Sequence, residues 1–189
     1  MRSRYDEDEA LRAVERWGPE HGEALALRTY TARLLGADPD LVLHGGGNTS
    51  VKGLKADDTG MHREALFVKG SGWDLATIEP RGHVAVDLAR LLPLRALDRL
   101  SDEAMVNAHR TRLFDATDPS PSVETLLHAF LPHRYIDHSH PDALLAISNL
   151  PDGPARLREA FGEDVIYVDY VMPGFALARA AADAFEANE

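Results

Sequence analysis

Helical and extended patterns alternate along this chain, and that alternation is the feature that most restricts its fold. Helices are predicted over residues 6–17, 19–35, 101–114, 122–131, 141–150 and 174–187. Strands are predicted over residues 41–43, 66–68, 83–88, 135–140 and 165–168, with a glycine-rich loop at 45–50 and a polar loop at 54–64. Interleaving of this kind, without an internal repeat, favours a layered α/β domain, and the short connections suit antiparallel neighbours.

The charge, the hydropathy and the absence of cysteine exclude several classes of partner and of site. The formal net charge is −11, with acidic residues spread along the chain, which argues against nucleic acid or an anionic membrane as a partner. No apolar run approaches the roughly 18 residues of a membrane span, and the acidic N-terminus lacks the apolar core of a signal peptide. The chain has no cysteine, so disulfides and thiolate metal sites are excluded. We therefore predict a soluble, cytoplasmic, single-domain protein. If its substrate is a small anion, local donors and not the overall charge would have to hold it.

Three short segments have the composition of an anion-binding site. The run Gly45–Ser50 follows a predicted strand, and backbone N–H groups in such glycine-rich turns bind phosphate, although a simple tight turn is the alternative. Lys69–Gly72 repeats the pattern after another predicted strand. Ser122 is predicted to cap the start of a helix, where the helix dipole favours negative charge. The three together suggest one phosphate pocket.

A pair of histidines, His138 and His140, is the strongest indication of metal binding. Side chains two apart on a strand point to one face, which is a geometry suited to metal ligands. A catalytic zinc usually has three protein ligands, so the third is missing from this segment. Glu124 is a candidate proton carrier beside the pair, although an acid in a first helical turn is also stabilised by the dipole alone. His128, on the same helix face as Glu124, would pair with it or pack into the core or against another subunit.

The other histidines are expected to be structural residues: His21, His44, His62, His83, His109 and His133. His44, directly before the glycine-rich loop, could instead touch a bound ligand.

The motifs, taken in order, resemble the class II aldolase/adducin superfamily, and more narrowly the aldolase part of bifunctional rhamnulose-phosphate aldolase/alcohol dehydrogenase proteins. The resemblance covers nearly the whole chain. It is carried by Gly47-Asn48-Thr49-Ser50, Ser71-Gly72, Ser122-Val123-Glu124, His138-Ser139-His140 and Tyr170-Val171-Met172-Pro173-Gly174.

The resemblance implies a three-layer α/β/α sandwich around a mixed, largely antiparallel sheet, usually assembled as a homotetramer. It also implies zinc-dependent retro-aldol cleavage of L-rhamnulose 1-phosphate to dihydroxyacetone phosphate and L-lactaldehyde. In that reaction Zn²⁺ would stabilise the negative charge of the enediolate, and Glu124 would carry the proton. The zinc ligands would be His138 and His140, and the residues implied to bind the substrate phosphate are Gly47, Asn48, Ser71, Gly72 and Ser122.

One part of the family pattern is absent from these residues. The third zinc histidine of the family lies in a His-Gly motif after the Pro-Gly element, whereas no histidine follows His140 here. We therefore expect a domain over 1–189 that is truncated at its C-terminus, with the third ligand beyond residue 189. The dehydrogenase half of the bifunctional relatives is also absent, so no NAD chemistry is expected.

Three alternatives stay open at this point. One is another sugar-phosphate reaction on the same scaffold, such as a 4-epimerase or a dehydratase. The second is a non-catalytic, adducin-like assembly module, against which the retained Glu124 and histidine pair argue. The third is a Schiff-base aldolase that uses Lys69, but nothing near Lys69 in the sequence would obviously lower its pKa.

Overall fold

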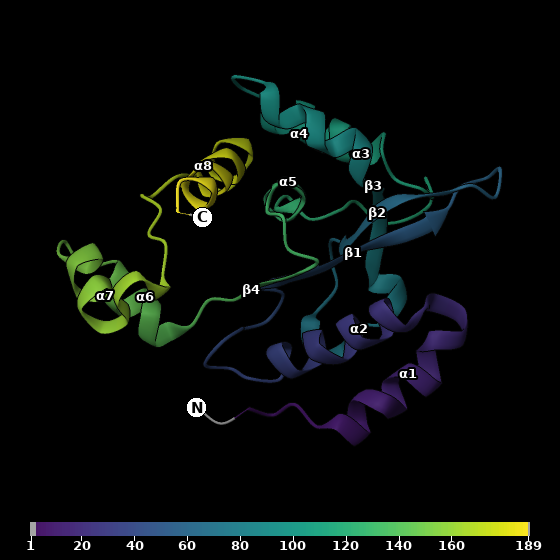
Figure 1. Ribbon diagram of the computed structural model, residues 1–189, viewed down its shortest axis with the longest axis horizontal. Coiled ribbons are helices and arrows are strands. Elements are labelled where there is room, and N and C mark those ends of the chain that lie inside the picture. The colour runs from purple at the N-terminus through teal and green to yellow at the C-terminus, as the bar shows by residue number, and fades with distance from the viewer. Residues whose placement is uncertain (1–2, 189) are drawn as a thin grey trace.

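A computed structural model describes residues 3–188, in which helices cover both faces of a four-stranded sheet (Figure 1). The strands are β1 (Asn48–Ala56), β2 (His62–Lys69), β3 (His83–Asp87) and β4 (Tyr135–His138). The α-helices are α1 (Glu7–His21), α2 (Glu23–Gly36), α3 (Leu88–Leu91), α4 (Asp102–Arg110), α5 (Thr125–Phe130), α6 (Asp142–Ser148), α7 (Gly153–Phe161) and α8 (Phe175–Glu186). Short 3₁₀ helices are η1 (Leu75–Thr77), η2 (Pro80–Gly82), η3 (Leu92–Ala96) and η4 (Gly162–Asp164).

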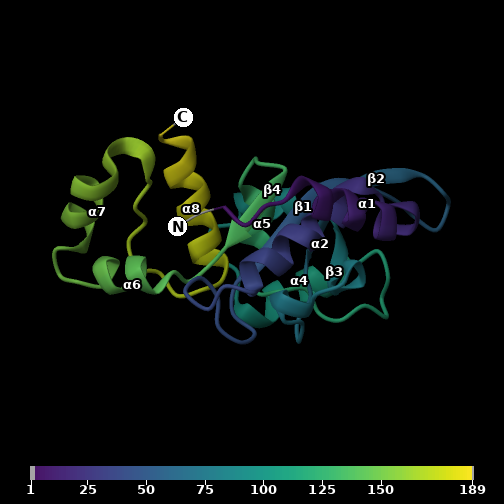
Figure 2. The same cartoon turned by 90° about the horizontal axis from the view of Figure 1, so that it is seen from below.

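The helices form two layers, one on each side of the sheet. Helix α2 lies against one face with α1 packed outside it, while α5 and α8 lie over the other face with α3 and α4 beside them (Figure 1). Helices α6 and α7 lie to one side, beyond β4 and α8 (Figure 2). This arrangement confirms the predicted α/β/α sandwich.

The sheet has the strand order β3-β2-β1-β4. All three strand pairs are antiparallel, so the described sheet is antiparallel throughout and not mixed. Strand β4 arrives late in the chain and pairs Asn48 with His138 at the start of β1. The register therefore brings the end of the glycine-rich segment directly beside the first histidine of the pair.

The main hydrophobic core lies between the sheet and the layer that contains α5 and α8. Leu66 and Val68 of β2 point into it, because alternate residues of a strand face the same side. Leu126 of α5 and Phe175 of α8 pack against them. Burying each such side chain contributes about 1.5–3 kcal/mol to the stability of the fold. This core therefore fixes the positions of the segments that carry the site. A smaller cluster under α2 consists of Ala32, Val42, Leu75 and Ile78.

Two predicted strands do not form. Leu41–Leu43 forms no strand: the amides of Leu41 and Val42 donate to the carbonyl of Asp38, and the strand begins only at Asn48. Strand β1 then runs through residues predicted as loops, because pairing with β2 and β4 outweighs the weak strand propensity of its glycine and lysines.

The second missing strand is 165–168. Although this segment is rich in β-branched residues, no strand is hydrogen-bonded to it within residues 3–188, and Val165 and Ile166 are exposed. Helix α7, by contrast, was not predicted.

No helix among the described residues has both the length and the apolar character needed to cross a membrane.

Candidate functional site

The end of β4 brings two imidazole rings together at the edge of the sheet. The ring centroids of His138 and His140 lie 4.7 Å apart, with the ring planes at 64°. The strand predicted over 135–140 ends at His138, so His140 lies two residues beyond β4. Its backbone amide donates to the carbonyl of Leu41 at 2.8 Å, which ties it to the segment before β1. Both rings are at least partly exposed, so a small ligand can reach them.

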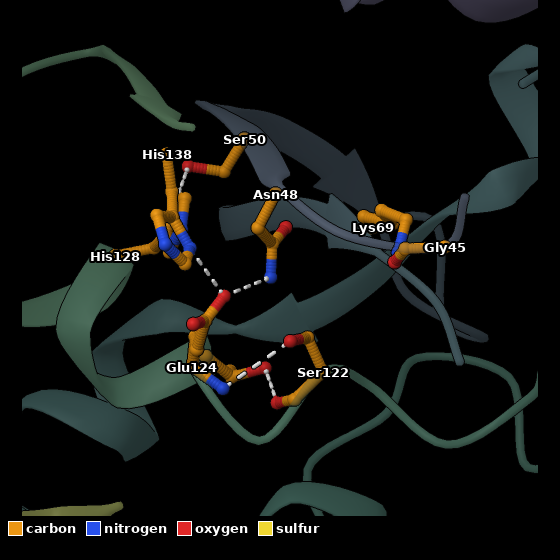
Figure 3. Close-up of polar contacts among 9 residues, drawn as sticks. Gly45, Asn48, Ser50, Lys69, Ser122, Glu124, His128 and His138 are labelled. Atoms are coloured by element: carbon orange, nitrogen blue, oxygen red, sulfur yellow. Dashed lines mark hydrogen bonds and ion pairs between the residues drawn. The ribbon is translucent and has the colours of Figure 1, made fainter. Parts of the chain in front are cut away.

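The carboxylate of Glu124 contacts His138, the less exposed histidine of the pair. Its Oε2 atom lies 2.8 Å from Nδ1 of His138 and accepts a 3.2 Å hydrogen bond from Nδ2 of Asn48 (Figure 3). Burial alone would raise the pKa of the Glu124 carboxyl, but the hydrogen bonds and charge of its neighbours, above all His138, lower the net pKa below its ordinary value. The carboxylate is therefore ionised at neutral pH and can accept a proton.

The donors present match part of a metal site. Because Glu124 occupies Nδ1 of His138, the Nε2 atom is the nitrogen left for a metal, which is the usual carboxylate–histidine–metal arrangement. His140 offers a second imidazole beside it. Among residues 3–188, however, no group of three or more histidine, aspartate or glutamate side chains is arranged to hold a metal ion. The structure thus supplies two imidazole ligands and no complete set.

The three segments predicted to bind phosphate meet at the end of β2. The Nζ atom of Lys69 donates to the carbonyl of Gly45 at 3.1 Å, which joins the first loop to the second (Figure 3). The amide of Ser122 donates to the carbonyl of Lys69 at 3.2 Å, and the amide of Ser71 donates to Ser120 at 2.8 Å. The structure therefore brings Gly47, Asn48, Ser71, Gly72 and Ser122 into one region beside Glu124.

Replacement of Gly47 by a larger residue would strain the backbone and crowd its neighbours. Its φ is +68°, a backbone angle that favours glycine, and a Cβ atom there would meet a Val42 methyl at 2.9 Å and the carbonyl oxygen of His138 at 3.0 Å. The glycine-rich loop is therefore packed directly against the backbone of the histidine strand.

Ser122 does not cap a helix, contrary to the prediction. Helix α5 begins at Thr125, and the residues before it form a turn in which the Ser122 hydroxyl accepts from the amide of Glu124 at 3.2 Å. The Ser122 carbonyl accepts from the amide and the hydroxyl of Thr125. These local bonds satisfy the chain before the first helical bond, which runs from His128 to Glu124, so Glu124 stands at the helix boundary.

The environment of Lys69 also differs from the expectation. Only 8% of the residue is exposed, and burial lowers the pKa of its amino group, although the charges of Glu124 and Asp74 raise it. The feature that lowers the pKa is tertiary burial, which no neighbouring residue in the sequence indicated. In the structure the amino group of Lys69 is hydrogen-bonded to the Gly45 loop and fixes its position.

The sequence interpretation missed two buried hydroxyl–imidazole contacts on opposite faces of β1. Thr49 Oγ1 lies 2.9 Å from Nε2 of His83 on the α2 side, and Ser50 Oγ lies 2.8 Å from Nδ1 of His128 on the α5 side. His128 thus packs into the core, one of the outcomes considered for it. A prediction of a strand from residue 48 would have placed Asn48, Ser50 and Lys52 on one face.

Comparisons with known proteins match most of the chain to one family. Residues 27–189 match the family described as the class II aldolase and adducin N-terminal domain. The chain is similar to the N-terminal class II aldolase domain of a conserved protein from Thermoplasma acidophilum, with 42% identity and a TM-score of 0.80, over 84% of this chain and 73% of that one.

A curated relative matches over a comparable part of the chain. The uncharacterized oxidoreductase YuxG of Bacillus subtilis (strain 168) is 39% identical over 159 residues, which are 84% of this chain. The chain spans only about a quarter of that protein, since the match covers 23% of its length.

Proposed function

The chain belongs to the class II aldolase and adducin family, and on that premise we propose that its site cleaves a ketose 1-phosphate by a retro-aldol reaction. The substrate we propose is L-rhamnulose 1-phosphate, and the products are dihydroxyacetone phosphate and L-lactaldehyde. The motifs that resemble the bifunctional rhamnulose-phosphate proteins support this choice of sugar. The membership of the family is established by the match; the sugar and the reaction are the proposal.

One observation carries the proposal. The carboxylate of Glu124 contacts both His138 of the histidine pair and Asn48 of the glycine-rich loop. A single ionised group therefore stands between the side chains suited to a metal and the loops suited to a phosphate. A ketose phosphate that spans the two would present its reacting carbons to this carboxylate.

Glu124 has the properties of the proton carrier that the reaction needs. Its pKa is lowered, so it starts as a base and can accept a proton when the bond between the two substrate fragments breaks. The proton comes from the hydroxyl that becomes the aldehyde oxygen of L-lactaldehyde, and Glu124 can then deliver it to the enediolate carbon of the dihydroxyacetone phosphate fragment. The hydrogen bond from Asn48 fixes the orientation of the carboxylate during both transfers.

His138 and His140 would hold a divalent metal, for which we propose zinc, with a further ligand from outside the residues that the structure describes. When bound, such a metal supplies Lewis-acid stabilisation of the negative charge that develops on the substrate oxygens. The loops that meet at Lys69 would bind the phosphate through Gly47, Asn48, Ser71, Gly72 and Ser122. The buried ammonium of Lys69 adds positive charge at that point, in a chain whose net charge is negative.

The proposal predicts that Glu124→Gln abolishes turnover and leaves the fold and the metal content intact. The amide keeps the size of the side chain but cannot carry the proton, so we expect a loss of at least about a hundredfold in kcat. Release of L-lactaldehyde from L-rhamnulose 1-phosphate by the full-length protein, with zinc measured in parallel, tests this. Glu64→Gln on the exposed part of β2 is the matched control and should retain full activity.

Other products would overturn parts of the proposal. An epimerised or dehydrated sugar phosphate would place the protein in another activity of the same scaffold. Full turnover in the Glu124→Gln variant would remove Glu124 from the mechanism. A Lys69 adduct trapped by borohydride with substrate would show that the reaction proceeds through a Schiff base and not through metal chemistry.

We also propose a homotetramer, as the family resemblance implies. Light scattering of the full-length protein measures this oligomeric state.

A further inference from the structure

A row of three polar contacts joins β1 to α5. Residues 48, 50 and 52 lie on one face of the strand, and residues 124, 128 and 131 lie on one face of the helix and its end. The contacts link Asn48 Nδ2 to Glu124 Oε2, Ser50 Oγ to His128 Nδ1, and Lys52 Nζ to the carbonyl of Leu131. The register of strand and helix is thereby specified at three points, and Glu124 is the first of them.

The middle contact is the most buried of the three. Ser50 and His128 are both 0% exposed, and their atoms lie 2.8 Å apart (Figure 3). In a site without solvent, a hydroxyl and an imidazole retain their hydrogen bond only over a narrow range of distance and angle. This contact therefore adds a directional restraint on the sliding and the rotation of α5 to that of the apolar packing.

Helix α5 needs such a restraint because it is short. It has 6 residues, and helices of this length owe their position to tertiary contacts. Glu124 stands at the boundary of α5, and the first helical hydrogen bond runs from the amide of His128 to its carbonyl at 3.1 Å. A shift of His128 is therefore transmitted through one turn of backbone to the carboxylate that contacts His138.

We propose that Ser50 and His128 are positioning residues for Glu124. Their contact holds α5 at the depth and rotation that place the Glu124 carboxylate between His138 and Asn48. They do not touch the substrate. The kinetic consequence of this inference rests on the proposed aldol function, whereas the structural consequence does not.

The chain contains a matched control on the opposite face of the same strand. Thr49 is also 0% exposed, and its hydroxyl lies 2.9 Å from a ring nitrogen of His83, itself buried. Thr49→Val and Ser50→Ala each remove one buried hydroxyl from a hydroxyl–imidazole contact in β1. Only the second contact leads to α5, so a general loss of stability and a loss of positioning can be separated.

Steady-state kinetics on the full-length protein with L-rhamnulose 1-phosphate gives the first test. We expect Ser50→Ala to lower kcat by at least about tenfold with KM and zinc content changed by less than about twofold, because a misplaced acid–base group affects the reacting state and not binding. Thr49→Val should leave kcat within about twofold of the parent protein. Equal losses of kcat in the two variants would overturn the proposal.

Replacement of the imidazole gives a second test by conservative rescue. Asparagine branches at Cγ, so His128→Asn keeps a polar atom near the position of Nδ1, whereas His128→Leu keeps the bulk and removes the polar atom. We expect the asparagine variant to retain clearly more kcat than the leucine variant. Equal kcat in both would show that only the volume of His128 matters, which contradicts a positioning role.

Amide hydrogen exchange tests the inference without any substrate. Ser50→Ala should increase exchange at residues 124–131, and Thr49→Val should not. If the parent protein cleaves no ketose phosphate, the proposed function fails, and this comparison alone decides the positioning role. Unchanged protection of residues 124–131 in Ser50→Ala would overturn it.

Discussion

At the scale of single residues, the site depends on positions where one residue meets two requirements. Gly47 has a positive φ, and it also approaches the carbonyl of His138 so closely that no side chain fits between them. The loop before β1 can therefore lie against the histidine strand only if this residue is glycine. The same closeness brings the loop amides toward the histidine pair.

Gly47→Ala should lower the free energy of unfolding by at least about 2 kcal/mol, because a left-handed backbone angle and three contacts below 3.2 Å are both unfavourable for a Cβ atom. Gly60→Ala is the control, since Gly60 also has a positive φ but open space around it. Urea unfolding of both variants measures the difference. Equal losses would show that the close approach is relieved by a shift of the loop.

At the scale of elements, β4 is a four-residue strand at the edge of the sheet that ends at His138, and His140 follows two residues later. Backbone pairing with β1 is reinforced from the opposite layer, where Arg28 of α2 lies 2.6 Å from a carboxylate oxygen of Asp137. Arg28 is only 2% exposed, so the carboxylate of Asp137 stabilises a positive charge that water cannot reach. The ion pair ties α2 to the strand, one residue before His138.

Asp137→Ala should therefore cost about 2 kcal/mol of unfolding free energy, less than in a fully buried pair because Asp137 is itself half-exposed. The reason is that Arg28 would be left as a buried charge without its carboxylate. Asp152→Ala, which breaks the exposed pair with Arg156 on α7, is the control and should cost much less. Similar urea midpoints for the two variants would contradict the prediction.

At the scale of the whole molecule, buried histidines couple stability to pH. Burial, with smaller effects from Arg28 and Lys69, lowers the pKa of His83 to about 3, and burial with Arg112 lowers the pKa of His109 to about 4. Both rings stay neutral in the folded protein near neutral pH, whereas the unfolded chain takes up protons below about pH 6.5. The folded state is therefore favoured above pH 6.5 and loses stability as the pH falls toward the folded-state pKa values.

We expect the free energy of unfolding to fall between about pH 6.5 and pH 5 by about 2 kcal/mol for each of these two histidines, because the unfolded state binds more protons. Urea unfolding at a series of pH values measures this slope. Burial also lowers the pKa of His128 to about 4, so three buried histidines contribute to the slope. A His109→Gln variant should therefore lower the slope by about a third. A slope that does not change with this substitution would show that other groups control the acid sensitivity.

Much of the fold could be predicted from local patterns. Helices α1, α2 and α8 and strand β3 have amphipathic or β-branched sequences that agree with their burial, and the alternation of elements indicated a layered α/β domain. The boundaries that failed lie where local and tertiary preferences disagree. Strand β1 contains glycine and two lysines, and it forms because it has partners on both sides. The 165–168 segment has strand propensity without such a partner among the described residues.

The sequence by itself determined the family, the spacing of His138 and His140 along the chain, and the order of the glycine-serine segments. These are properties of residue type and spacing within short stretches of chain. Only the tertiary structure decided that Glu124 contacts His138, that Ser50 meets His128 and that burial lowers the pKa of Lys69. The physical reason is that each depends on atoms brought together by packing: Ser50 and His128 are separated by 78 residues, and neither their hydrogen bond nor their burial exists before the sheet and its helices are assembled.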